Sequence, residues 1–172
     1  ENGTYTNNGD YDDFEKGQSY LTLDKTEQDM VALVCKNFDN VIVVYNGANT
    51  MEMNWTDKYP QIKGVLLCPG AGSTGFNAFG EIISGEVNPS GKTVDTWVKD
   101  LTQTPYFNNI GDFTYDNIQD YVAEIIAADN GSLQPGTFVD YNENIYVGYK
   151  FYETAAEEGL IDYDALVQYP FG

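Results

Sequence analysis

The chain has 172 residues, of which 42% are hydrophobic and 15% aromatic, enough to build the packed core of one domain. Eight basic residues against 27 acidic ones give a formal net charge of -19, which repels nucleic acid phosphates and anionic membrane surfaces. There is no histidine, so the chain alone supplies neither a Ser-His-Asp triad nor a Cys-His pair, and without histidine or closely spaced cysteines it lacks the usual ligand set of a zinc site.

The amino-terminal region is rich in Asn, Gly, Asp and Tyr and has no apolar period, so residues 1–20 are predicted to form an extended loop. It lacks the basic-then-apolar layout of a signal peptide, and no apolar run in the chain approaches the roughly 20 residues that a membrane-spanning helix needs. Because the chain starts at Glu1 without an initiator Met, we expect it to be a piece of a longer protein.

Acidic and aromatic side chains of this loop are candidate ligand contacts. Its acidic residues are Asp10, Asp12, Asp13 and Glu15, and its tyrosines are Tyr5, Tyr11 and Tyr20. The acidic residues lack the Gly and Glu spacing of an EF-hand, so solvated charge is the simplest interpretation, with sugar hydroxyls or a loosely held cation as alternatives. The tyrosines suit the apolar faces of sugar rings, although packing against a neighbouring domain explains them as well.

A helix is predicted over 25–38, where Asp24 and Glu27 form a capping pair at its start. Cys35 within this helix and Cys68 further on are expected to be buried thiols. A β-branched run over 41–45 and a second run rich in apolar residues over 62–67 predict adjacent strands at the centre of a mainly parallel sheet.

The alternation of helix and strand continues as far as Trp97 and then breaks. Up to Trp97 the predicted elements are short helices over 51–58 and 76–84 and a strand over 93–98. After it come an aromatic loop over 104–115, a helix over 116–128, strands over 138–141 and 145–152, and a short acidic helix over 157–165. The predicted core residues are Met30, Val34, Val43, Leu66, Phe76, Ile83, Val94 and Tyr149. We therefore predict the α/β class: one domain over residues 1–172, a layered α/β/α sandwich with a mainly parallel sheet and an irregular second half.

A glycine-rich loop over 69–75 follows the second predicted strand. Gly70, Gly72 and Gly75 satisfy the Gly-x-Gly-x-x-Gly spacing of dinucleotide-binding loops. However, no acidic residue closes a βαβ unit at the expected distance and no basic side chain lines the loop. We expect the loop to bind no nucleotide, and we expect no cofactor.

Three segments together carry a family resemblance. The run Gly-Glu-Val-Asn-Pro-Ser-Gly-Lys over 85–92 joins a helix to a strand, with Gly85 suited to end the helix in the left-handed conformation. With Val-Ile-Val-Val-Tyr-Asn over 41–46 and Asn-Ile-Tyr-Val-Gly-Tyr-Lys-Phe-Tyr over 144–152, it resembles the carboxy-terminal sandwich domain of family 3 glycoside hydrolases of the β-glucosidase type. The resemblance extends from about Leu21 to Gly172.

This resemblance implies that the chain is part of a two- or three-domain enzyme, a retaining β-glycosidase that hydrolyses O-glycosidic bonds with two carboxyl groups. In the family, the nucleophile is an Asp of a preceding (α/β)8 barrel domain, and the acid/base is a Glu in a Gly-Glu-Gly motif before the first helix. Here Glu1-Asn2-Gly3 lacks the preceding glycine, so we expect the acid/base just upstream, with Glu1 as the remaining catalytic candidate in the chain. Glu15 is less favoured, because no glycine flanks it. The candidate substrate contacts are Tyr5, Tyr11, Asp12 and Asp13.

The expected partners are a β-linked saccharide or glycoside and the barrel domain of the parent enzyme, with a homodimer as a further alternative. The isolated chain is expected to be inactive. Location stays open between the cytoplasm and the bacterial cell surface. The rival hypothesis is a non-catalytic α/β module that binds a small ligand or a partner at its strand ends.

Overall fold

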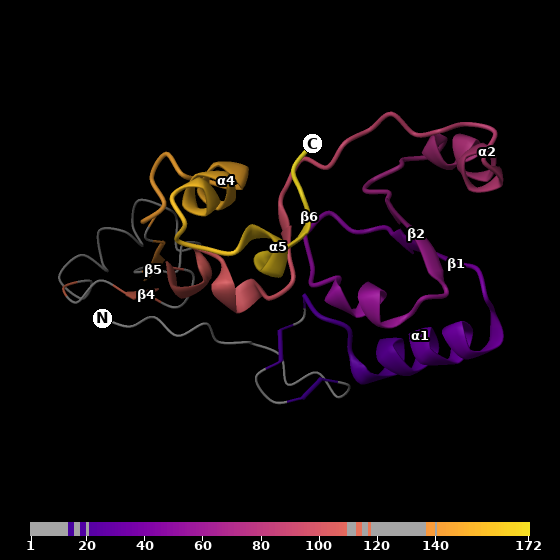
Figure 1. The fold of residues 1–172 in the computed structure, drawn as a ribbon, viewed down its shortest axis with the longest axis horizontal. Coiled ribbons are helices and arrows are strands. Elements are labelled where there is room, and N and C mark those ends of the chain that lie inside the picture. The colour runs from indigo at the N-terminus through magenta and orange to yellow at the C-terminus, as the bar shows by residue number, and fades with distance from the viewer. Residues whose placement is uncertain are drawn as a thin grey trace, which may run out of the picture.

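The structure is a computed structural model that describes residues 14–15, 18–19, 21–109, 113–114, 117, 137–139 and 141–172 (Figure 1). Its helices are α1 (Lys25–Asn37), α2 (Phe79–Ser84), α4 (Tyr149–Glu157) and α5 (Tyr163–Leu166). Its strands are β1 (Val41–Tyr45), β2 (Ile62–Leu67), β3 (Trp97–Val98), β4 (Phe113–Thr114), β5 (Thr137–Phe138) and β6 (Val167–Tyr169). Short 3-10 helices cover Asn54–Lys58, Gly75–Ala78, Leu101–Gln103 and Phe107–Asn109. This mixed content agrees with the predicted α/β class.

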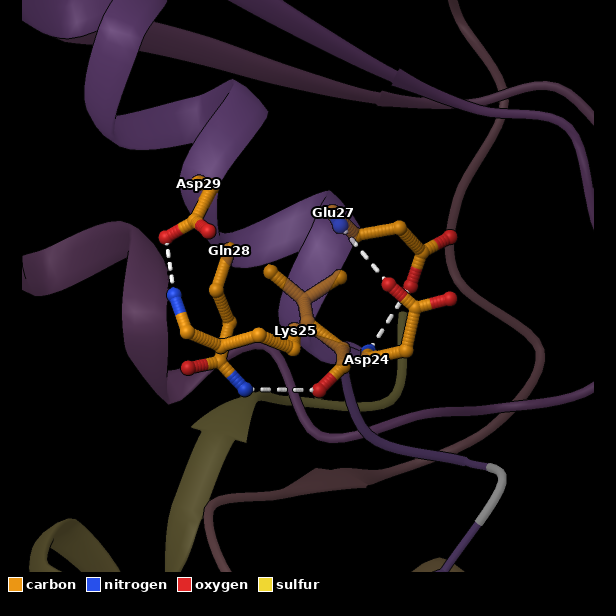
Figure 2. A network of polar contacts seen from close by, with 6 residues as sticks. Asp24, Lys25, Glu27, Gln28 and Asp29 are labelled. Carbon is orange, nitrogen blue, oxygen red and sulfur yellow. Dashed lines mark hydrogen bonds and ion pairs between the residues drawn. The ribbon is translucent and has the colours of Figure 1, made fainter. Parts of the chain in front are cut away.

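Helix α1 starts where its sequence predicts, at a complete capping box (Figure 2). The Glu27 N–H donates to Asp24 Oδ1 at 2.7 Å, and the Asp24 N–H donates to Glu27 Oε2 at 3.1 Å. Lys25 and Asp29 form an exposed i,i+4 ion pair one turn further on. The two capping hydrogen bonds satisfy backbone N–H groups that the start of a helix otherwise leaves unpaired. They therefore determine the residue at which α1 begins.

Strands β1 and β2 pair in parallel, with Val43 opposite Val65 and Tyr45 opposite Leu67. Pairing and direction confirm the prediction from their apolar runs. In the described part of the chain, however, the two strands form a two-stranded sheet, so each keeps one unpaired edge and neither is central. A cavity of ≈ 320 Å³ separates α1 from β1, and the buried thiol of Cys35 lies at its wall, as predicted for that cysteine.

The carboxy-terminal half has its own core. Strand β3 pairs antiparallel with β6, and α4 and α5 pack next to this pair (Figure 1). The buried cluster consists of Val98, Leu101, Tyr152, Leu166 and Val167. A third sheet, also antiparallel, joins β4 to β5.

Several predicted elements are wrong or shorter than expected. The predicted strand over 145–152 is wrong, because α4 begins at Tyr149 and buries Tyr152 and Ala155, three residues apart, on one face. The strand over 93–98 is reduced to its last two residues, and the strand over 138–141 overlaps β5 at Phe138 alone. The acidic helix over 157–165 is replaced by the end of α4 and the short α5. The helix predicted over 116–128 lies outside the described residues, apart from Asn117 in a turn.

The predicted core is also partly wrong. Val34, Val43, Leu66 and Tyr149 are half-buried. Four others are exposed: Met30 (57%), Phe76 (45%), Ile83 (38%) and Val94 (73%). Apolar periodicity identifies which face of a helix or strand is apolar. It does not identify which other part of the protein packs against that face, or whether any part does.

Gly85 confirms a prediction made from a single residue. It caps α2 with φ 80° and ψ 11°, a left-handed conformation that glycine adopts without a steric penalty. Among the described residues, no helix is both long and apolar enough to span a membrane.

Candidate functional site

The sequence-predicted site residues Glu1, Tyr5, Tyr11, Asp12 and Asp13 all lie outside the described residues. What the structure does describe is how the segment that follows them attaches to the fold. The Gln18 N–H donates to the Glu15 carbonyl at 2.9 Å, and the Glu15 N–H donates to Gln18 Oε1 at 3.0 Å. The segment therefore turns back on itself immediately before α1.

The side chain of Gln18 fixes this turn to the start of α1. Its Nε2 donates to Thr22 Oγ1 and to the Leu23 carbonyl, both at 2.8 Å. The Leu23 carbonyl also accepts a bond of 2.8 Å from Gln28 Nε2 (Figure 2). The chain thus enters α1 along a defined path.

A polar cleft of ≈ 280 Å³ lies at this entry point. Its polar walls include Gln18, Thr22, Gln28, Glu52, Asn54 and Lys58, and Trp55 and Tyr59 add aromatic surface. Helix α1 runs back along β1, so the helix start and the residues after β1 meet at the carboxyl edge of the parallel pair (Figure 1). This is the edge at which open α/β sheets bind their ligands.

Glu52 connects this cleft to the carboxy-terminal half. Its carboxylate Oε1 accepts the Leu101 N–H at 2.8 Å, and its own N–H donates to the Leu21 carbonyl at 2.8 Å. Next to it, Asn54 Nδ2 donates to the Lys99 carbonyl at 2.8 Å. The segment after β1 is therefore tied to both the helix entry and the segment after β3.

The two carboxyl groups at this junction have pKa values shifted in opposite directions. Burial raises the pKa of Glu52, the bond from the Leu101 N–H opposes that rise, and the charge of Asp100 adds to it. Asp100 has a lowered pKa, chiefly because the Thr102 hydroxyl donates to it at 2.6 Å. A carboxyl group with a raised pKa costs the folded state stability as it ionises.

We expect the Glu52→Gln variant to gain stability relative to the wild type as pH rises from the ordinary pKa of a Glu side chain, about 4.3, through the raised pKa of the folded state. The unfolded state ionises Glu52 at a lower pH than the folded state does, so the wild type loses this contribution over that interval, while glutamine does not titrate. Urea unfolding at several pH values measures the difference in unfolding free energy between the two proteins. A difference that stays constant or falls with pH would contradict the raised pKa.

The chemistry of the cleft suits a neutral ligand rich in hydroxyl groups. Carboxylate and amide groups pair with hydroxyls, and the aromatic walls can cover the apolar face of a ring. Within the described ranges, no group of three or more His, Cys, Asp and Glu side chains is placed to hold a metal ion. The sequence prediction missed Glu52 and Asn54, although their position shortly after an apolar parallel strand was a usable signal.

Comparisons with known proteins place the chain in a family. The family model described as Glycosyl hydrolase family 3 C-terminal domain matches residues 4–149. Beta-glucosidase A of Butyrivibrio fibrisolvens is 35% identical over 161 residues, which are 92% of this chain and 16% of that protein. Thermostable beta-glucosidase B of Acetivibrio thermocellus is 26% identical over 90% of this chain and 16% of its own length.

A third relative, Beta-glucosidase of Ruminococcus albus, is 27% identical over 91% of this chain and 13% of its own length. The chain thus spans between about an eighth and a sixth of the length of these relatives. The family match covers most of the chain and includes α1, the parallel pair β1–β2 and the cleft. We conclude that the chain belongs to the glycoside hydrolase family 3 carboxy-terminal domain family.

Proposed function

We propose that this chain is one α/β domain of a retaining β-glycosidase that hydrolyses β-linked glucosides or related O-glycosides. The observation that carries the proposal is the family match over 4–149, joined to relatives that are named as beta-glucosidases. The polar, aromatic cleft beside the amino-terminal segment supports it, because its chemistry suits a sugar.

In this proposal the chain completes a site whose two reacting carboxyl groups come from elsewhere. Retaining hydrolysis requires a nucleophile and an acid/base roughly 5 to 5.5 Å apart. We assign the nucleophile to an Asp of a barrel domain and the acid/base to a Glu just upstream of Glu1, with Glu1 as the candidate within the chain. Tyr5, Tyr11, Asp12 and Asp13 are then contacts to the sugar.

The barrel domain is the proposed partner of this chain, and exposed apolar side chains on α1 and directly after it support a contact with a further protein surface. Met30, Leu33 and Phe38 are 57%, 62% and 63% exposed, although each is a large apolar side chain. Exposed large apolar side chains that gather in one region mark interaction sites in soluble proteins. A homodimer formed through the same residues is the alternative arrangement.

The rival function, a non-catalytic module that binds a small ligand, is not favoured by the relatives, which are named as enzymes. The two proposals differ in what the longer polypeptide does. We expect the full polypeptide that contains this chain to cleave an aryl β-glucoside and to release glucose first as the β-anomer, because two successive displacements retain configuration. Proton NMR of the first product measures this.

Release of the α-anomer first would rule out the retaining mechanism. Absence of any β-glycoside cleavage, together with saturable sugar binding by the 172-residue chain alone, would instead favour the binding module. An aryl α-glucoside serves as the control substrate, since the proposed site should leave it uncleaved.

A further inference from the structure

The polar cleft at the start of α1 has walls from three parts of the chain. They are the segment before α1, α1 itself and the segment after β1, which continues into the 3-10 helix Asn54–Lys58. The cleft volume of ≈ 280 Å³ lies just below the range of about 300 to 1,000 Å³ that is usual for drug-sized ligands, so the cleft suits a single small ring. Three of its side chains keep a hydrogen-bonding atom that the protein itself does not use.

Two of these side chains are amides whose orientation is determined by backbone carbonyl groups. Gln28 Nε2 donates to the Leu23 carbonyl (Figure 2), and Asn54 Nδ2 donates to the Lys99 carbonyl, each at 2.8 Å. Because a backbone carbonyl only accepts, the bonded atom of each amide is its nitrogen. The oxygens, Gln28 Oε1 and Asn54 Oδ1, are left as acceptors, and neither has a partner among the described residues.

Glu52 adds a third acceptor, and this one is charged. Its Oε1 accepts the Leu101 N–H at 2.8 Å, whereas its Oε2 is not buried and has no partner in the described part of the chain. The carboxylate is thus held at one oxygen and open at the other. The exposed side chain of Lys58 brings a positive charge to the same cleft, and it forms no ion pair with Glu52.

These groups select the class of ligand. A ligand that satisfies three acceptors must bring hydrogen-bond donors, and hydroxyl groups supply them. A cationic ligand would meet Lys58 and an anionic ligand would meet Glu52, so a neutral ligand avoids both like-charge contacts. The side chains of Trp55 and Tyr59 line the same cleft and can cover the apolar face of a sugar ring.

We propose that the polar cleft binds one neutral sugar ring through the hydrogens of its hydroxyl groups, and that Glu52 determines a preference for neutral over acidic sugars. The choice of a sugar among polyhydroxyl ligands rests on the proposed glycosidase function, since the relatives are named as beta-glucosidases. Glu52 acts through Oε2, so the hydrogen bond from the Leu101 N–H to Oε1 stays in place when the ligand binds. These contacts are additional to the candidate contacts within residues 1–13.

The two tryptophans of the chain allow a direct test by NMR. Trp55 lines the polar cleft, whereas Trp97 is 5% exposed and does not line it. Titration of the isotope-labelled chain with methyl β-glucoside is expected to shift the indole N–H signal of Trp55 with a dissociation constant of about 1 to 10 mM, and to leave the Trp97 signal in place. The Trp55→Phe variant assigns the two signals.

Two results of this titration would overturn the proposal. One is the absence of a saturable Trp55 shift up to about 100 mM sugar, in a chain whose β1 amides are protected from hydrogen exchange. The other is an equal shift of the Trp55 and Trp97 signals, which would show an effect of the added sugar on the whole chain.

Methyl β-glucuronide, which carries a carboxylate, tests the role assigned to Glu52. At neutral pH we expect the wild type to bind it at least about tenfold more weakly than methyl β-glucoside, because two carboxylates then meet. Glu52→Gln keeps an oxygen for the Leu101 N–H but replaces the open oxygen with an amide donor. The difference between the two sugars should therefore shrink to less than about threefold.

Glu86→Gln is the matched control, since it neutralises an exposed carboxylate that does not line the cleft. We expect this variant to keep the difference of about tenfold or more between the two sugars. A difference that persists in Glu52→Gln as well, or that disappears in both variants, would overturn the role of Glu52.

Cleavage of an aryl β-glucoside by the full polypeptide separates this proposal from the proposed function. Cleavage without a Trp55 response in the chain would overturn the sugar site in the cleft and leave the glycosidase function standing. A Trp55 response without cleavage would support the sugar site and overturn the glycosidase function. We expect both the cleavage and the response.

Discussion

The 172-residue chain, assayed alone, is expected to release no product from an aryl β-glucoside above the buffer background. Retaining hydrolysis needs a nucleophile and an acid/base together, and in our proposal at most one of them, Glu1, is in this chain. Losing a general acid alone costs about 100-fold to 10,000-fold in rate, and losing the nucleophile as well removes the covalent step. A sensitive fluorogenic glucoside, compared with the full polypeptide at equal molar concentration, gives the measurement.

Glu52 and Asp100 are the described pair of carboxyl groups that could be mistaken for a catalytic pair, so a variant of Glu52 serves as a control for this assay. Glu52 and Asp100 interact and have pKa values shifted in opposite directions, which is also how an acid and a nucleophile are distinguished in glycosidases. Here Glu52 is bonded to the Leu101 N–H, and Asp100 accepts bonds from Thr102 and Gln103, so both groups hold structure together. Turnover by the isolated chain that disappears in Glu52→Gln would contradict our assignment.

Mixing the chain with a separately produced barrel portion that includes the upstream loop is expected to restore some turnover. In that mixture, Glu1→Gln should leave the rate nearly unchanged, because we place the acid/base upstream of Glu1. A fall of about 100-fold or more would show that Glu1 is the acid/base after all.

The features predictable from the sequence are those that neighbouring residues determine. The capping box at Asp24 and the left-handed Gly85 depend on contacts within a few residues, and both are confirmed. The pairing of β1 with β2 was predictable because two short runs rich in apolar residues, joined by a crossover, favour parallel neighbours. The family resemblance was predictable for a different reason, since it came from whole segments read in order.

The remaining features depend on surfaces that no local pattern specifies. Alternation over 145–152 suits a strand, but the same residues place Tyr152 and Ala155 on one helical face against the carboxy-terminal core, and the helix forms. Met30 and Val94 have the apolar character of core residues but are exposed, because no described segment of the chain packs over these two side chains. The cleft was missed because Gln18, Glu52 and Lys58 come together only through the fold.

Met53 is 1% exposed and lines two cavities, one between α1 and β1 and one between β2 and the β3–β6 pair. We expect Met53→Ala to lower the free energy of unfolding by about 3 to 5 kcal/mol, in the upper part of the range for buried methionine. The loss has two parts, the burial of the thioether side chain and the new empty volume. Because the residue already borders two cavities, few neighbouring atoms are placed to collapse into that volume.

Chemical denaturation of Met53→Ala and Met30→Ala measures this effect against a matched control. Met30 lines the same cavity beneath α1 but is 57% exposed, so its truncation should cost less than about 1 kcal/mol. Met53→Leu, which nearly conserves volume, should cost less than about 1.5 kcal/mol and separates lost volume from lost sulfur. Equal costs at Met53 and Met30 would mean that the segment after β1 packs less closely against the parallel pair than the burial of Met53 indicates.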